Sequence, residues 1–326
     1  MQPRLGLAPF NSQDFIFEVK WDGVRALVAK DEQGLRITDR HGADLLARLP
    51  ELAPVARQLP DGVLVDAEIV TCDRKGRPRY ELLAGRLGPK ARQSGHGPLV
   101  LAFDLLYAAY RPLFERPLVE RRERLVRLVL PGGPLLVPEY LESDGEPFYE
   151  AVLEFGLEGI VAKRKDAPYV PGARSGDWLK VHSVPRMDVV VCGAVLADAL
   201  PASLICGAYR DHALTYVGRA RVPAFLREHA SQQLAGLLTA TSPLEGPVDM
   251  PAGARWLQPE RCAIVEHSGP PGRLAEDARL RSFRVDGRPS DCRIEDGIRM
   301  PSGMPRLESG RPRLVVLRSL FPAGGA

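Results

Sequence analysis

Residues 17–25 read Phe-Glu-Val-Lys-Trp-Asp-Gly-Val-Arg and place Lys20 directly behind a short apolar segment. A lysine amine becomes a nucleophile once it loses its proton, and nearby cations or a metal favour that loss, whereas an arginine stays charged. Only seven of the 44 basic residues are lysines, so a lysine in this K-x-D-G-x-R pattern indicates a nucleophile. The alternative is a strand that ends in a turn at Asp22-Gly23, with Lys20 as a solvated charge.

Four further segments, each built on an apolar run, follow this stretch along the chain. They are residues 63–70 (V-L-V-D-A-E-I-V), 99–107 (L-V-L-A-F-D-L-L-Y), 158–163 (E-G-I-V-A-K) and 178–182 (W-L-K-V-H). Each of them alone suits an ordinary buried strand. Their order and spacing relative to Lys20 therefore matter more than any single segment.

Taken in order, the five segments resemble the signature motifs of the covalent nucleotidyltransferases, which comprise DNA ligases, RNA ligases and mRNA capping enzymes. In that family the motif lysine attacks the α-phosphate of a nucleoside triphosphate and holds the nucleotide through a P–N bond. The resemblance implies a nucleotidyltransferase (adenylation) domain of two antiparallel sheets with the nucleotide between them. It also implies that a second domain, an OB-fold barrel, follows.

Composition is compatible with this interpretation. The chain of 326 residues is long enough for two domains, and its 45% hydrophobic and 26% charged residues are typical of a soluble protein. The five cysteines form no C-x-x-C pair, which argues against a zinc site or a disulfide framework and predicts a reducing cytoplasm. We expect no signal peptide and no membrane span, because Asp198 and Pro201 interrupt the most apolar stretch. The net charge of +3 permits a nucleic-acid partner.

The first domain is expected to cover residues 1–184 and to have an α+β fold. Apolar runs between Gly, Pro and Asp predict strands at residues 15–20, 24–30, 35–38, 63–70, 100–107 and 159–163. Helices are predicted at residues 117–130 and 147–155. The first of these helices is expected to be charged on one face and to pack its other face inward, through Leu118, Leu125, Val126 and Val129.

The second domain is expected to cover residues 185–299. Short strands at 187–196, 204–209, 214–219 and 263–267, with a helix near 223–238, suit a small barrel of the OB type, a fold that often binds nucleic acid. The alternative is a generic β-domain used for packing. Pro, Gly, Ser and Arg dominate residues 300–326 and predict a poorly ordered tail.

The resemblance assigns Lys20 as the catalytic residue and places ATP beside it. Glu18 and the backbone of Val19 would meet the edge of the adenine, while Phe103 would stack on its face. Glu68 would hold a ribose hydroxyl. These four residues would therefore bind the nucleoside part of the nucleotide.

Further residues are assigned to phosphate and metal. Glu158, together with Glu68, would bind Mg²⁺ or Mn²⁺, because hard cations prefer oxygen ligands and bridge phosphates. Without a metal these carboxylates would repel the polyanion, and their alternative role is that of exposed charges at strand ends. The cationic side chains that would contact ribose or phosphate oxygens are Arg25, Arg40, Lys163 and Lys180.

Three positions depart from the family pattern. Ala67 replaces the glycine of D-G-E, which a strand tolerates where φ is negative. His182 stands where W-x-K-x-K has its second lysine, which predicts a weaker or pH-dependent phosphate contact. The segment around Arg284, a further predicted ATP contact, resembles the last motif, R-x-D-K, but Gly287 occupies its lysine position. We therefore expect slower self-adenylylation.

The context of the first motif looks most like the ligase domain of bacterial end-joining DNA ligases. This implies an ATP-dependent DNA ligase that seals 5′-phosphate/3′-hydroxyl breaks through lysyl-AMP, in DNA repair or end joining. Its expected partners are duplex DNA with nicks or ends and end-joining proteins, and we expect a monomer in the bacterial cytoplasm, near the nucleoid. Two alternatives stay open: a non-catalytic nick- or end-binding protein with a ligase-like fold, and an RNA ligase.

Overall fold

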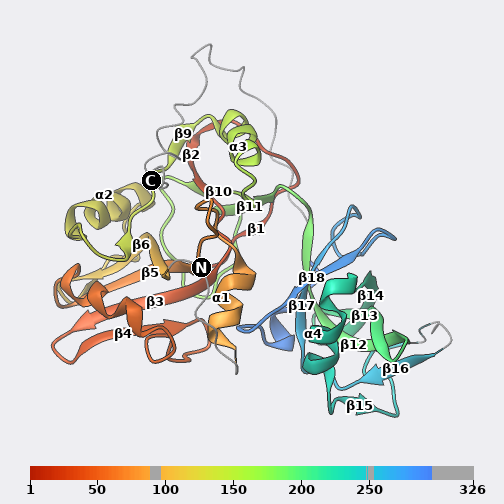
Figure 1. Cartoon of the computed structure of the whole chain (residues 1–326). Coiled ribbons are helices and arrows are strands. Elements are labelled where there is room, and N and C mark those ends of the chain that lie inside the picture. The colour runs from red at the N-terminus through yellow and green to blue at the C-terminus, as the bar shows by residue number, and fades with distance from the viewer. Residues whose placement is uncertain (89–96, 247, 249–252, 296–326) are drawn as a thin grey trace. The chain divides into compact units, whose positions relative to one another are not determined.

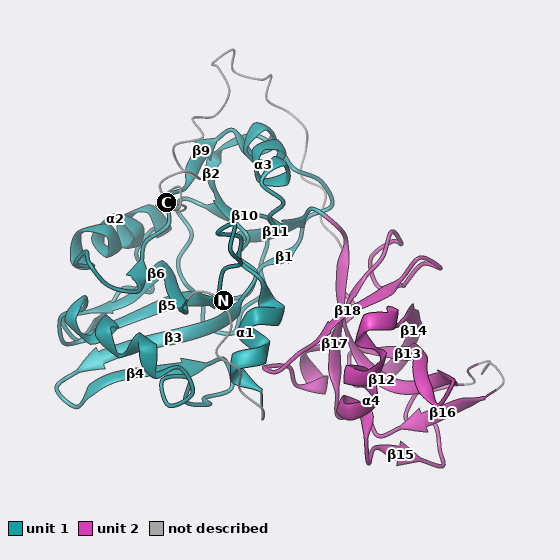
Figure 2. Cartoon of the chain, viewed as in Figure 1, with its two compact units in different colours: residues 1–183, 298–326 teal, residues 184–297 magenta. Residues whose placement is uncertain are grey.

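The computed structural model describes residues 1–88, 97–246, 248 and 253–295 (Figure 1). The chain divides into two compact units, whose described parts lie within residues 1–183 and 184–295 (Figure 2). The tail predicted for residues 300–326 lies outside the described residues.

The first unit contains two mainly antiparallel sheets. Sheet I has the strand order β1-β11-β10-β2-β9, with bounds Arg4–Leu5, Trp178–His182, Gly159–Arg164, Ser12–Val19 and Leu141–Ser143. Sheet II has the order β4-β3-β5-β6-β7, with bounds Gly34–Asp39, Val24–Asp31, Val63–Val70, Leu99–Ala108 and Arg111–Pro112, and β8 (Leu135–Leu136) pairs with β6. The pairings β1–β11 and β6–β8 are parallel, and the others in these two sheets are antiparallel.

The described residues of the first unit also form three helices and a 3₁₀ segment. Their bounds are Tyr80–Leu87 for α1, Leu118–Leu128 for α2, Gly145–Glu154 for α3 and Pro50–Arg57 for the 3₁₀ segment. Helix α3 lies against β2 and β10 (Figure 1). Its residues Phe148 and Val152 are buried in the same apolar cluster as residues of these strands. Helix α1 has no counterpart among the predicted elements.

One face of sheet I forms an apolar core under α3. Alternate residues of a strand point to the same face, so the pattern F-x-F-x-V of β2 places three large side chains together. The residues of this core face, all buried, are Phe15, Phe17, Val19, Ile160, Ala162, Leu179 and Val181. The opposite face is therefore free to carry polar residues.

The buried face of α2 differs from the predicted one. Val126 is 59% exposed, whereas Arg121 and Arg122 are buried beside Leu118 and Leu125. Positions 118, 121, 122 and 125 form one stripe at helical spacing. The prediction was wrong at these positions because it treated every charge as solvated, whereas both guanidinium groups find partners inside the protein.

The second unit contains a closed barrel of five strands in the order β12-β13-β14-β18-β17, and the barrel closes because β17 also pairs with β12. Their bounds are Arg186–Ala197, Leu200–Arg210, Ala213–Arg221, Arg279–Phe283 and Cys262–Glu266. Two strands, β15 (Leu238–Thr239) and β16 (Ala254–Leu257), extend the sheet from β12. Pairing between β14 and β18 is parallel, and α4 (Arg227–Leu234) lies between β14 and β17 in the chain.

The interior of the barrel is apolar. Buried residues from all five strands meet the α4 residues Ala230 and Leu234 in one cluster. Short 3₁₀ segments lie at Ala224–Leu226 and Pro289–Asp291. The predicted α+β fold, with a sheet-built first region and an OB-like barrel, is confirmed.

Candidate active site

The register of sheet I brings several of the predicted site residues together on the face opposite the apolar core. Glu18 on β2 pairs with Val161 on β10, which pairs with Lys180 on β11, and two residues further along Lys163 pairs with Trp178. Paired residues share a face, and so do residues two apart on one strand. We call the resulting set the site face; it consists of Glu18, Lys20, Lys163, Trp178, Lys180 and His182.

Lys20 lies at the end of this face in contact with an acid. Its backbone N–H donates to the carbonyl of Gly159 (2.8 Å), and its Nζ donates to Glu158 Oε1 (2.7 Å). The Lys20 side chain is 21% exposed, so it is accessible but is not a solvated turn residue. The predicted nucleophile and the predicted metal ligand are therefore neighbours, although 138 positions separate them in the chain.

His182 approaches the same carboxylate. Its Nδ1 lies 3.5 Å from Glu158 Oε1. Burial, reinforced by the charge of Lys20, lowers the pKa of His182 to about 4, against the attraction of Glu158. His182 is thus neutral at pH 7 and adds no positive charge at the place where the family motif has a lysine.

Asp22 and Gly23 have structural roles that explain their place beside Lys20. The Asp22 carboxylate accepts a hydrogen bond from the backbone N–H of Tyr80, the first residue of α1 (3.3 Å). A Cβ on Gly23 would lie 2.1 Å from the carbonyl oxygen of Ile69, so only glycine fits against β5. These contacts anchor the segment that carries Lys20 to α1 and to sheet II.

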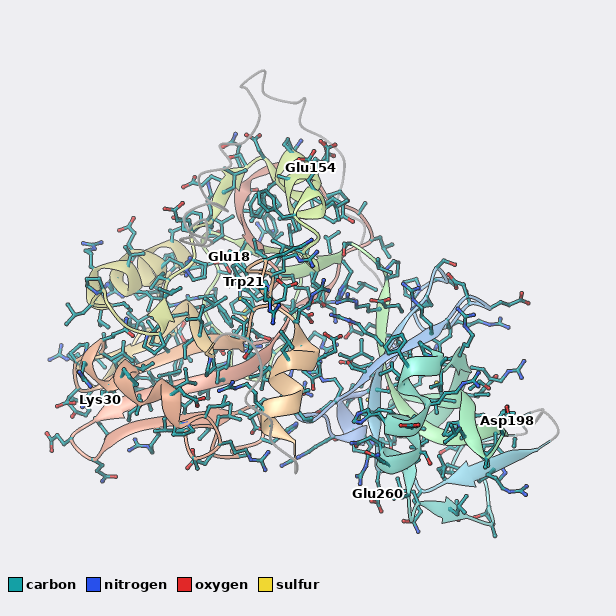
Figure 3. The ribbon with its side chains drawn as sticks, viewed as in Figure 1. Glu18, Trp21, Lys30, Glu154, Asp198 and Glu260 are labelled. Carbon is teal, nitrogen blue, oxygen red and sulfur yellow. The ribbon has the colours of Figure 1, made fainter. Side chains whose placement is uncertain are left out.

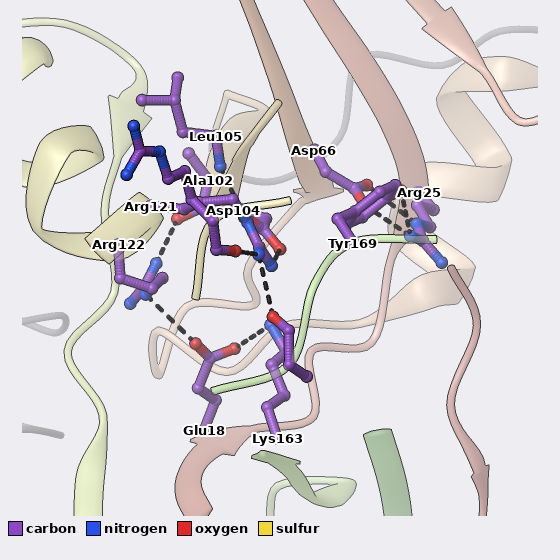
Figure 4. Close-up of polar contacts among 12 residues, drawn as sticks. Glu18, Arg25, Asp66, Ala102, Asp104, Leu105, Arg121, Arg122, Lys163 and Tyr169 are labelled. Carbon is purple, nitrogen blue, oxygen red and sulfur yellow. Dashed lines mark hydrogen bonds and ion pairs between the residues drawn. The ribbon is translucent and has the colours of Figure 1, made fainter. Parts of the chain in front are cut away.

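A buried ion cluster occupies the middle of the site face (Figure 4). Lys163 Nζ lies 2.6 Å from Glu18 Oε2, and Arg122 Nε lies 3.4 Å from Glu18 Oε1. The ammonium also lies over the rings of Phe103 (4.2 Å) and Trp178 (4.4 Å). Burial lowers the pKa of Lys163, which Glu18 partly offsets. The predicted base-edge acid, base-stacking ring and phosphate lysine are therefore all in contact.

Sheet II contributes a second ion pair, opposite the site face. Arg25 Nε donates to Asp66 Oδ1 (2.9 Å), its Nη2 donates to Asp66 Oδ2 (2.5 Å), and Tyr169 Oη donates to Asp66 Oδ2 (2.8 Å). The Arg25 guanidinium also lies 5.7 Å from the rings of both Phe103 and Trp178. These contacts connect the two sheets around the predicted nucleotide position.

Four polar atoms of the site face are buried without a hydrogen bond from the described part of the protein. They are Glu18 Oε1, Lys163 Nζ, Trp178 Nε1 and His182 Nδ1, of which Lys163 Nζ is ion-paired with Glu18 Oε2. A buried polar atom without a partner is costly and rare in native proteins. An acceptor, a donor and an imidazole nitrogen left in this state on one face indicate a site built for a polar ligand.

The other predicted residues lie at different depths. Glu68 is half-buried on β5, paired with Arg25. Val19 buries its side chain in the core face, which leaves only its backbone as a candidate contact, and Arg40 is exposed after β4. Figure 3 shows Glu18 and Trp21 inside the first unit, whereas Lys30 projects at its edge.

In the second unit, Arg284 makes a bidentate pair with Asp286 (2.9 and 2.7 Å). A Cβ on Gly287 would lie 2.9 Å from the Cβ atoms of both Arg284 and Cys262, closer than such atoms approach. A lysine therefore cannot replace Gly287 without a shift of this segment. The departure from R-x-D-K is built into the local packing.

Sequence reasoning missed Arg122, which contacts the site face, and several other buried charged residues of the first unit. Asp66 appeared only as part of a strand motif, and the buried pair of Asp104 with Arg121 (2.7 and 2.8 Å) was not predicted, nor was Arg122. Burial raises the pKa of Asp104 against the effect of Arg121. An available signal was the position of both arginines on the Leu118–Leu125 stripe of α2.

The acidic residues suit a cation that phosphate oxygens also bind. Among the described residues, no group of three His, Cys, Asp or Glu side chains could hold a metal by itself. Mg²⁺ commonly takes one or two carboxylates together with substrate phosphates and water. Glu158, beside Lys20, fits that mode.

The chain resembles known proteins along most of its length. Residues 4–182 match the family model described as ATP dependent DNA ligase domain. The multifunctional non-homologous end joining protein LigD of Mycobacterium bovis is 33% identical over 298 residues, which cover 87% of this chain and 38% of that protein. The SPbeta prophage-derived DNA ligase-like protein LigB of Bacillus subtilis is 30% identical over 190 residues, 58% of this chain and 69% of that protein.

A solved DNA ligase structure is also similar to this chain. The mycobacterial DNA ligase D complexed with ATP and MES is 31% identical, with a TM-score of 0.61, over 90% of this chain and 98% of the solved chain. The chain thus spans less than two fifths of the full-length LigD relative and nearly all of the solved ligase. From the family match over more than half of its residues, this chain belongs to the ATP-dependent DNA ligases.

Proposed function

We propose that the protein seals breaks in duplex DNA that carry a 5′-phosphate and a 3′-hydroxyl, using ATP and a lysyl-AMP intermediate on Lys20. The observation that carries the proposal is the position of Lys20 Nζ, 2.7 Å from Glu158 Oε1 at the end of a face that holds Glu18 and Lys163. The contact fixes the amine where a nucleotide between the sheets would present its α-phosphate. Positioning of this kind is a major source of rate in phosphoryl transfer.

The chemistry then follows from the amine. Lys20 attacks the α-phosphorus of ATP, a P–N bond forms, and the bond from that phosphorus to pyrophosphate breaks. The AMP next passes to the 5′-phosphate of the break, and the P–N bond is exchanged for a phosphoanhydride. The 3′-hydroxyl finally attacks the 5′-phosphorus, which forms the phosphodiester and releases AMP.

The remaining residues would bind and orient the nucleotide. Lys163 and Lys180 would offset phosphate charge, and Phe103 would stack on the base. Mg²⁺ or Mn²⁺ at Glu158, with Glu68 as a second acid, would supply charge neutralisation on the phosphates. Arg284 would act from the second unit.

Two observations bear on the non-catalytic alternative. His182 is neutral at pH 7, and Gly287 has no room for a lysine. Both reduce the positive charge available to the departing pyrophosphate and support a slow first step rather than its loss, because Lys20 contacts Glu158 and Lys163 contacts Glu18.

We also propose that the protein works as a monomer in a reducing bacterial cytoplasm, near the nucleoid, with end-joining proteins. None of the helices in the described part of the chain has the length and apolar character that a membrane crossing requires.

The test is covalent labelling followed by nick closure. With α-³²P-ATP and Mg²⁺, label should remain on the denatured protein and be released by acid but not by base, as expected of a phosphoramidate. The labelled protein should then seal nicked duplex DNA, with weaker binding as salt rises. Efficient joining of single-stranded RNA without closure of nicked DNA would favour an RNA ligase instead, and DNA binding without any label would favour the non-catalytic protein.

A further inference from the structure

Two consecutive arginines on α2 are buried to the same extent and have different partners. Arg121 is 0% and Arg122 is 1% exposed. Arg121 forms its bidentate pair with Asp104 and donates to the carbonyl of Ala167 (3.0 Å), so its charge is neutralised within the scaffold. Among the described residues, Arg122 has no carboxylate that pairs with it alone, and the acid it approaches is Glu18 of the site face, which also pairs with Lys163.

The contacts of Arg122 join three parts of the site. Its Nη1 donates to the carbonyl of Ala102 (3.1 Å), the residue before Phe103, and its Nη2 donates to the carbonyl of Pro138. Its guanidinium also lies 5.5 Å from the ring centre of Tyr140. A planar group held at two corners by backbone carbonyls has a fixed orientation. Its third corner, Nε, lies 3.4 Å from Glu18 Oε1, without a hydrogen bond between them.

The two carboxylate oxygens of Glu18 are therefore in different states: one is ion-paired, and the other has no hydrogen bond within the described residues. Lys163 takes Oε2 at 2.6 Å, whereas Oε1 lies 3.4 Å from Arg122 Nε and has no hydrogen bond within the described residues. At 3.4 Å the two charges attract each other, but the contact is too long for a good hydrogen bond. Glu18 Oε1 can therefore accept a hydrogen from a ligand without breaking the ion pair.

We propose that Arg122 is a positioning residue for choice of the nucleobase: it holds Glu18 so that Oε1 accepts a hydrogen bond from the amino group of adenine. This inference rests on the proposed use of ATP. Adenine carries an amino donor where guanine carries a carbonyl acceptor, which a buried carboxylate would repel. Arg122 also donates to the carbonyl of Ala102 on β6, the strand that carries Phe103. It therefore contacts both Glu18, which would meet the edge of the base, and the strand of the ring that would stack on it.

The experiment measures how strongly Arg122 is coupled to the amino group. Dissociation constants are measured by calorimetry in a Lys20→Ala background, which prevents chemistry, for ATP, GTP and purine riboside triphosphate, which lacks the amino group. With Arg122 present, removal of the amino group should weaken binding about tenfold, equivalent to about 1.4 kcal/mol. In Arg122→Met that penalty should fall to about twofold or less, and the preference for ATP over GTP should shrink with it.

The variant Arg122→Lys covers the case in which Arg122→Met does not fold. It keeps the charge but cannot contact both carbonyls and Glu18, so the penalty should lie between the two values. A penalty that is unchanged in Arg122→Lys, or in a folded Arg122→Met, overturns the inference.

The neighbouring arginine provides the matched control. The double variant Asp104→Asn/Arg121→Met removes an equally buried arginine together with its acid, which avoids an uncompensated charge. Its melting temperature should change, but the amino-group penalty should stay at the parental value. A loss of the penalty in this control as well would reduce Arg122 to a structural role.

Covalent labelling distinguishes an error in the proposed function from an error in the role of Arg122. If the protein with Lys20 intact takes no label from ATP, the proposed function is wrong whatever Arg122 does. If it is labelled and the penalty does not depend on Arg122, only the positioning role is wrong.

Discussion

The two faces of sheet I are made from the same strands and differ in almost every property. The core face packs Phe15, Phe17 and Ile160 under α3, and all three are buried. The site face carries Glu18, Lys163 and other charged or polar groups, several of them just as buried. Burial is therefore not what separates structure from function in this sheet.

What separates them is how buried groups are satisfied. On the core face, apolar side chains lose water and gain contacts, which stabilises the fold without further conditions. On the site face, charged groups pair with other charged groups, and Glu18 Oε1 and Trp178 Nε1 accept or donate no hydrogen bond within the part of the chain that the structure describes. A substitution on the core face should therefore affect stability, and one on the site face should affect chemistry. Four substitutions or conditions test this difference, from the largest expected effect to the smallest.

Lys20→Arg should abolish self-labelling, a loss of at least about 10⁴-fold, because a guanidinium cannot act as the nucleophile. The midpoint of urea unfolding should change little, since the Lys20 side chain is accessible. Lys30→Arg is the control, because Lys30, on β3 of sheet II, pairs with Asp61 in the turn before β5, and it should be labelled like the parent. Label on Lys20→Arg at the parental level would show that another residue is the nucleophile.

Phe17→Ala should have the opposite profile. Phe17 is fully buried, and its ring packs edge-on against Phe10 (5.4 Å), so truncation should cost about 3–5 kcal/mol of unfolding free energy. Labelling per folded molecule, corrected by the unfolding curve, should stay within about threefold of the parent, a change of under about 0.7 kcal/mol. Stable protein without label would show that the two faces are not independent.

Glu158→Gln should slow self-labelling about 100-fold, equivalent to about 2.7 kcal/mol, because it weakens the hold on Lys20 and removes a charge from the expected metal site. The Mg²⁺ concentration needed for half-maximal labelling should also rise. Glu142→Gln is the control: Glu142 on β9 of the same sheet pairs with Lys165, away from Lys20, and should leave labelling and Mg²⁺ dependence unchanged. An unchanged Mg²⁺ requirement in Glu158→Gln would show that Glu158 does not bind the metal.

The smallest expected effect is a loss of unfolding free energy at high pH, and it concerns Cys72, a buried residue of the apolar core of the first unit. Burial, assisted by Asp73, raises the pKa of this thiol from 9 to about 11. Because the folded pKa is above the unfolded one, its stabilisation is complete below pH 9 and is lost as pH rises through 11. Between these limits the wild type should lose about 1–2 kcal/mol more unfolding free energy than Cys72→Ala. If the curves of unfolding free energy against pH stayed parallel for the wild type and Cys72→Ala from pH 8.5 to 10.5, this prediction would be wrong.

Apolar runs punctuated by Gly, Pro and Asp allowed most of sheets I and II to be predicted. The polar residues of the E-V-K, E-G-I-V-A-K and W-L-K-V-H segments lie two or more positions apart on apolar runs, and the strands occur where the runs do. The predictions for α2 were wrong at Val126, Arg121 and Arg122 because exposure of an arginine depends on partners elsewhere in the chain. Helix α1 was also missed, although its first N–H is capped by Asp22 from the lysine motif.

The sequence by itself determined the order of the motifs, the periodicity of the strands and the identity of the lysine, because these are local properties of side chains and backbone. Only the tertiary structure decided which of these residues meet. The register between β2, β10 and β11 places Lys20 against Glu158 and Glu18 against Lys163, and the packing of α2 brings Arg122 to Glu18. Such contacts join residues more than 100 positions apart, and they depend on strand pairing and helix packing rather than on local preference.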